Sequence, residues 1–224
     1  MQSFMVATKD KGWLFAAFLS QVKKHYLLAL LSAMRFHHVQ TAMNFRQVLE
    51  SGVNAGYALA NPRSEDFTVT SPEGLLETPK RLQTKRYKWL EQNYPAASKS
   101  IASLKKAIQS SAHSNIVDAH RNFEYTHQDK SVLLNMPFFD QYNEFQMITD
   151  FWLTENIAIG LLDMFYGINK DYKVLTFSSD FVPKLLELQE INNRIKAKVM
   201  DSEKFQRADR RAKAKEERLK LGSK

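Results

Sequence analysis

Apolar residues recur every three or four positions from Leu14 to Met34, within a stretch between Gly12 and Gly52 that contains no glycine or proline. This periodicity predicts a helix with a wide buried face. A second helix is predicted from about His37 to Ala60, where Asn61-Pro62 supplies a stop signal. The pattern leaves open whether these are two helices or one long kinked rod.

Residues 63–78 combine Pro72 and Gly74 with scattered Ser, Thr and Glu, which predicts a surface connection. Thr78-Pro79 then predicts the start of a basic, aromatic helix, with Thr78 as its cap and Pro79 at its first position. We expect that helix to end at Tyr94-Pro95 and another to run from about Ala96 to Ala112.

Residues 114–140 have an ambiguous pattern, in which Lys130 to Phe139 fits a loop or an extended segment. We favour a helix to about His127 and then a loop. The apolar stretch Phe145 to Tyr166 predicts the central helix of the fold. Asp180 is expected to cap a last helix, whose apolar stripe stops near Met200.

Together these elements predict an all-α fold, a bundle of five to seven helices with a charged C-terminal helical extension. Residues 1–203 would form a single helical-bundle domain and residues 204–224 a basic, charged tail. We find no internal repeat of solenoid period.

The chain has no cysteine, which excludes a disulfide scaffold, a thiolate metal site and a cysteine nucleophile. Its N-terminus lacks the features of a signal peptide. Two segments approach membrane length, 13–34 and 148–168, but both contain charged residues that are costly at a bilayer centre. We therefore expect a cytoplasmic protein that does not insert into a membrane.

The net charge of +8 is concentrated in two segments. Residues 204–224 contain nine Lys or Arg against three Asp or Glu, and residues 80–106 contain eight against one. The tail could dock on an acidic protein partner, or it could be a solvated helix end.

The basic segment that begins at Pro79 offers cations for phosphate groups and aromatic rings, Tyr87 or Trp89, for stacking on a base. We therefore name RNA as a candidate partner. The alternative is a solvated exterior, since Leu82, Arg86 and Trp89 share one helix face. The candidate nucleic-acid-binding residues are Lys80, Arg81, Lys85, Arg86 and Lys88.

Three charged residues fall on faces that the apolar pattern predicts to be buried: Arg46, Glu50 and Glu155. Because a buried charge is costly unless it is paired, we expect a buried polar network, with Arg46 as the first choice of partner for Glu155. The alternative is that these side chains form the inner wall of a pocket.

His113, His120 and His127 are spaced by seven residues. On a helix that rises about 1.5 Å per residue, neighbours would lie roughly 10 Å apart, too far to share one metal ion. Glu124 and His127 form one Glu-x-x-His unit, whereas helical di-iron bundles need two. We therefore expect no metal site and no cofactor.

The segment Arg121-Asn122-Phe-Glu-Tyr-Thr-His127 resembles the Arg, polar residue and His signature of the HEPN superfamily of all-helical proteins, which includes ribonucleases. A second stretch, Phe45 to Tyr57 followed by Ser110-Ser-Ala-His113, resembles an uncharacterised bacterial helical family often placed near that superfamily. The resemblance makes either His113 or His127 the functional histidine.

The HEPN resemblance implies metal-independent RNA cleavage at a dimer interface. Arg121 would stabilise the charge that develops on phosphorus, His127 would act as general acid or base, and Asn122 would be the polar residue of the same site. The alternative is a non-catalytic interaction or oligomerisation module in which the histidines are structural.

Overall fold

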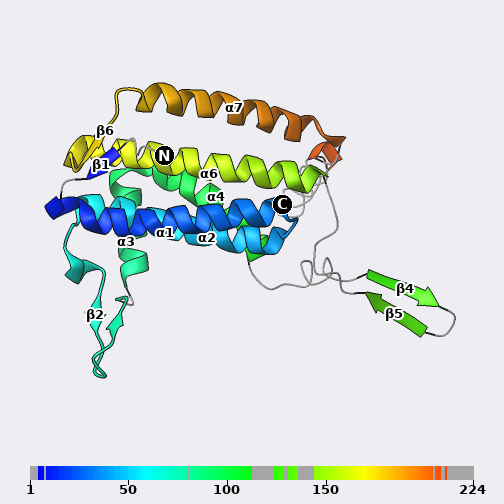
Figure 1. The fold of residues 1–224 in the computed structure, drawn as a ribbon, viewed down its shortest axis with the longest axis horizontal. Helices are drawn as coiled ribbons and strands as arrows, with labels where there is room; N and C mark the ends of the chain where they lie inside the picture. The colour runs from blue at the N-terminus through cyan, green and yellow to red at the C-terminus, as the bar shows by residue number, and fades with distance from the viewer. Residues whose placement is uncertain are drawn as a thin grey trace, which may run out of the picture.

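The computed structural model describes residues 5–7, 9–79, 81–112, 124–128, 131–135, 144–203, 205–207 and 210. Within them the chain is an all-α bundle, as the periodicity predicts (Figure 1). The α-helices in these ranges are α1 (Lys9–Met34), α2 (His38–Ala60), α3 (Leu82–Asn93), α4 (Pro95–Ala112), α6 (Glu144–Tyr172) and α7 (Phe181–Asp201).

The first two predicted helices are separate and pack against each other (Figure 1). The turn between them is a Schellman motif, in which the His37 N–H donates to the Ser32 carbonyl at 2.9 Å and the Phe36 N–H to the Ala33 carbonyl at 3.1 Å. Phe36 takes the left-handed conformation with φ of 59°. This reversal brings α2 back along α1.

The core lies where α2 meets α6, with α1 and α4 packed on either side of that contact. Gly52 and Gly56 on α2 face Leu161 and Ile168 on α6, and a methyl group at either glycine would meet those side chains within 3.0 Å. The absence of a side chain therefore lets the two helices approach closely. The most deeply buried residues include Phe15, Phe45, Val48, Leu49, Ile157, Leu161, Phe165 and Ile168.

The far end of α6 is tied to a small sheet. Strand β6 (Leu175–Phe177) pairs in antiparallel register with β1 (Met5–Ala7). The buried Asn169 side chain donates to the Leu175 carbonyl at 2.8 Å and accepts from the Leu175 N–H at 2.7 Å. Asn169 thus fixes the turn from α6 into β6, after which α7 folds back along α6 (Figure 1).

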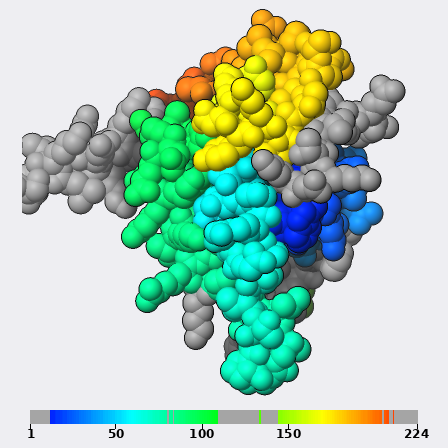
Figure 2. All heavy atoms as spheres, turned by 90° about the vertical axis from the view of Figure 1, so that its left-hand side faces the viewer, coloured from blue at the N-terminus to red at the C-terminus, as the bar shows by residue number. Residues whose placement is uncertain are grey.

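The predicted surface connection between α2 and α3 contains a short helix, η1 (Ser64–Asp66), and a hairpin of β2 (Val69–Thr70) and β3 (Leu76–Glu77). Figure 2 shows this hairpin projecting from the bundle. The predicted cap at Thr78-Pro79 is wrong by three residues. The Pro79 carbonyl instead accepts the Leu82 N–H at 2.9 Å, forming a turn before the helix starts.

The last helix begins after Asp180, as predicted, but the Asp180 side chain makes no capping hydrogen bond and pairs with Lys184 instead. Val199 is the last buried residue of this helix. Ser202 ends it, with its hydroxyl donating to the Val199 carbonyl at 2.6 Å. Beyond residue 203 the structure describes only 205–207 and 210, so most of the predicted basic tail lies outside the described residues.

In the part of the chain that the structure describes, no helix is both long and apolar enough to cross a membrane.

Candidate functional site

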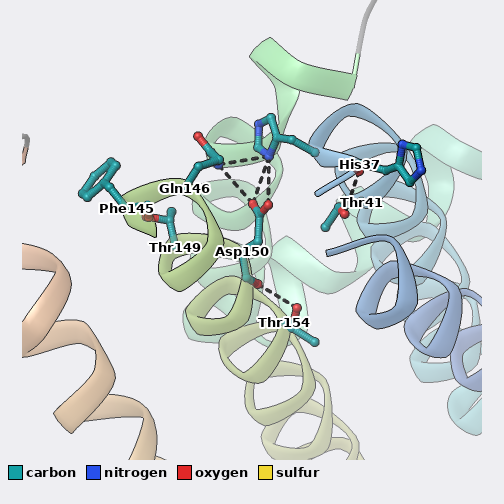
Figure 3. A network of polar contacts seen from close by, with 8 residues as sticks. His37, Thr41, Phe145, Gln146, Thr149, Asp150 and Thr154 are labelled. Carbon is teal, nitrogen blue, oxygen red and sulfur yellow. Dashed lines mark hydrogen bonds and ion pairs between the residues drawn. The ribbon is translucent and has the colours of Figure 1, made fainter. Parts of the chain in front are cut away.

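A buried polar network joins the start of α2 to the start of α6. His38 Nδ1 lies 3.0 and 3.1 Å from the two carboxylate oxygens of Asp150. The side chain of Asp150 is 5% exposed and that of His38 14%. Figure 3 shows the Asp150 carboxylate and the Gln146 amide converging on this imidazole at the end of the bundle that holds the α1–α2 turn.

The network holds the imidazole ring of His38 in one orientation. Because a carboxylate can only accept, the Nδ1–H of His38 donates to Asp150, and Asp150 thereby sets the direction in which the ring points. Gln146 Nε2 donates to Asp150 at 3.1 Å and lies 3.0 Å from His38 Nδ1. Both nitrogens therefore carry hydrogens directed at one carboxylate, and two donors satisfy that buried charge.

Sequence reasoning missed this network because its members are 112 residues apart. The available signal was Asp150 itself, an acidic residue in the most apolar segment of the chain, since such a residue requires a partner when buried.

The HEPN-like motif is only partly described. His113, Arg121 and Asn122 lie outside the described residues, and His127 lies in a strand, β4 (Glu124–Gln128), which pairs with β5 (Ser131–Asn135). The predicted helix to about His127 is therefore wrong over 124–127. In the hairpin, His127 is opposite Val132, and the apolar run after it belongs to a strand rather than to a loop.

Because residues 124–128 form a strand, no continuous helix runs from His113 to His127. A spacing of seven residues aligns side chains only along a continuous helix. Among the described residues, no group of three or more His, Asp or Glu side chains is placed to hold a metal ion.

The candidate RNA-binding residues divide into two environments. Lys85 and Lys88 are exposed on α3, as is Arg81 just before it, and Lys85 pairs with Asp66 at 2.9 Å. Arg86, by contrast, is only 6% exposed and donates to the side-chain oxygen of Asn54. Arg86 lies with Leu82 on the buried face of α3, so it is not among the exposed cations. Lys80 lies outside the described residues.

Helix α4 packs against α3 and adds the exposed cations Lys99 and Lys106. Figure 2 shows α4 (green) along one side of the molecule. We define the α3–α4 basic surface as Arg81, Lys85, Lys88, Lys99 and Lys106. Glu91 is the one acidic residue in the α3 and α4 segments. Most of the positive charge of residues 80–106 is therefore carried by side chains that face solvent.

The predicted network of Arg46, Glu50 and Glu155 is present only as a pair of Arg46 with Glu50. Arg46 Nε donates to Glu50 Oε1 at 3.1 Å within α2, and the two side chains are 38% and 23% exposed. Burial raises the pKa of Glu155. An ion pair with Arg46 would lower that pKa, so the structure does not support Arg46 as its partner.

One face of α1 exposes large apolar side chains. Leu27 is 47% exposed, Leu31 50% and Met34 59%, and these positions follow the i, i+4, i+7 spacing of a single helix stripe. Leu28 on the same helix is 40% exposed. The bundle thus has an apolar face as well as a basic one.

No protein-family model, curated protein or solved structure matches this chain.

Proposed function

We propose that the protein binds RNA through the α3–α4 basic surface. This is supported by the exposed cations on α3 and α4, two helices that pack together and contain a single acidic residue, Glu91. Lys and Arg side chains neutralise phosphates and release the counterions condensed on the nucleic acid, which supplies affinity without requiring sequence readout. Lys85 would make the weakest contact, since Asp66 already neutralises it.

The test is fluorescence anisotropy with a labelled single-stranded RNA over a series of salt concentrations. In the triple variant Lys88→Met, Lys99→Met, Lys106→Met, we expect weaker binding and a salt slope reduced by about 0.7 per lost contact, the value for single strands. The matched control changes three exposed lysines elsewhere, Lys173, Lys196 and Lys198. Equal losses in both triple variants would refute the proposed surface.

RNA cleavage is a further part of this proposal and rests on the HEPN resemblance alone. Arg121 would stabilise the charge on phosphorus and His127 would transfer the proton, with Asn122 beside them. Incubation of the pure protein with mixed RNA in EDTA should yield cleavage that Arg121→Ala and His127→Ala both abolish. Equal residual activity in wild type and both variants would indicate contamination and refute the catalytic assignment.

The alternative function, a non-catalytic oligomerisation module, is favoured by the apolar face of α1. Two copies of one helix stripe can pack about a two-fold axis, which is the commonest closed assembly of identical chains. Light scattering would show a dimer that Leu31→Lys converts to a monomer. If wild type and variant are both monomers at tens of micromolar, this alternative fails.

A further inference from the structure

Two cations from different helices meet at one tyrosine. Lys105 Nζ on α4 lies 3.3 Å from the hydroxyl oxygen of Tyr87 and 4.4 Å from the centre of its ring. On α3, the Arg86 guanidinium carbon lies 5.3 Å from the same ring centre, and Arg86 also interacts with the Tyr87 hydroxyl. The half-buried Tyr87 ring therefore lies close to two positive charges.

The charge of Arg86 is incompletely compensated. Its side chain is only 6% exposed, one guanidinium nitrogen donates to Asn54, and the buried Nε has no hydrogen-bond partner. Burial is the main influence on the Arg86 pKa and lowers it, while Tyr87 and Glu50 raise it. Glu50 is the carboxylate that acts on Arg86, and it is already paired with Arg46 at 3.1 Å.

Arg86 and Lys105 thus lie beside Tyr87 where α3 meets α4, and the Glu50 carboxylate that acts on Arg86 is shared with Arg46. A buried guanidinium is costly unless an anion and further hydrogen bonds compensate it. Guanidinium and ammonium groups that converge beside a hydroxyl are the donors that phosphate oxygens prefer.

We propose that Arg86, Lys105 and the Tyr87 hydroxyl form an anion site that binds a phosphate group. This inference rests on the proposed function, where the bound group would be a phosphate of the RNA. The site differs from the α3–α4 basic surface because it is built from partly and fully buried side chains and recognises one phosphate at a fixed place. Lys105 and Tyr87 are half-buried, whereas Arg86 is buried.

The experiment is calorimetric titration of the full chain with pyrophosphate at constant ionic strength. We expect Lys105→Met to weaken binding about tenfold, the loss that one charge-assisted hydrogen bond supplies. Tyr87→Phe, which keeps the ring and removes the hydroxyl, should also weaken binding. The triple variant of Lys88, Lys99 and Lys106 should weaken it less than Lys105→Met alone, although it removes three charges.

Arg86→Lys keeps the charge and removes the guanidinium, and it should reduce pyrophosphate binding in a protein whose thermal melt remains cooperative. If that variant does not fold, Lys105→Met and Tyr87→Phe decide the result. The inference is overturned if wild type does not bind pyrophosphate, or if the triple variant loses as much affinity as Lys105→Met.

The same preparations separate this inference from the proposed function. Pyrophosphate binding with the expected losses, in a protein that does not bind the labelled RNA, supports the anion site and refutes RNA as its ligand. RNA binding in a protein that does not bind pyrophosphate supports the α3–α4 basic surface and refutes the anion site.

Discussion

Gly52 on α2 lies directly against Leu161 on α6, so that a methyl group added at Gly52 would stand 2.5 Å from Leu161 Cδ2. Leu161 is 2% exposed and belongs to the main core, which leaves its side chain little room to move. We predict that Gly52→Ala lowers the free energy of unfolding by about 1–3 kcal/mol, because overpacking outweighs the higher helix propensity of alanine. Denaturant unfolding measures this change.

Gly167, near the C-terminal end of α6, is the matched control. A methyl group there meets nothing within 4 Å. Gly167→Ala should therefore show only the propensity effect and raise stability by up to about 1 kcal/mol. If both substitutions stabilise the protein, the close contact between α2 and α6 is not a packing constraint.

The helix boundaries were well predicted wherever the sequence carries a local stop signal. Asn61-Pro62 and Tyr94-Pro95 end α2 and α3 as expected, because proline removes a backbone donor and restricts the residue before it. The β4–β5 hairpin was missed because a short apolar run, such as Val132 to Leu134, fits a strand, a loop edge or a helix equally well.

The candidate site was less predictable than the fold. Periodicity identifies which face of a helix is buried, but it does not say which polar residue of another helix will meet that face. Periodicity predicted that Arg86 and Leu82 share one face of α3, and both are buried in the structure. The partner of Arg86, however, is Asn54 on α2. The pairing of His38 with Asp150 likewise depends on the turn that reverses α2 along α1.

Asp150 holds the start of α2 against α6, so removing its carboxylate should destabilise that end of the bundle. In Asp150→Ala, His38 and Gln146 each lose an acceptor in a site that is nearly closed to water. A loss of about 1–3 kcal/mol per unsatisfied buried group is expected in denaturant melts. Asp163→Ala, an exposed aspartate on the same helix, should change stability by less than about 0.5 kcal/mol. Similar small effects for both would mean that the network contributes nothing to stability.

Removal of residues 204–224 should leave the bundle nearly intact. Val199 is the last buried side chain of α7, and Ser202 ends the helix with its own hydrogen bond before the truncation point. A terminal segment that buries little apolar surface contributes little to stability. Thermal melts of the two proteins should nearly coincide, and a clear fall in melting temperature after truncation would show that the tail docks on the bundle.

Glu155 gives a prediction with a defined pH dependence. Its carboxyl group is partly buried on α6, and burial raises its pKa. The pKa of Tyr26 on α1 is raised mainly by burial and also by the charge of Glu155. Because the folded protein holds the Glu155 proton more tightly than the unfolded chain, the stability from this group is complete below the ordinary glutamate pKa. It is lost as the pH rises through the raised value.

Glu155→Gln removes that titration, so the variant should become more stable than wild type as the pH rises from 4 to 8, and the two should converge at the acidic end. Denaturant melts across this range measure the difference, with Glu187→Gln, an exposed site on α7, as the control that should show no such trend. A buried ion pair with Arg46 would give the opposite result, a loss of about 3–5 kcal/mol near neutral pH when one partner is removed. The sign of the change at pH 7 therefore decides between a desolvated carboxyl group and a paired one.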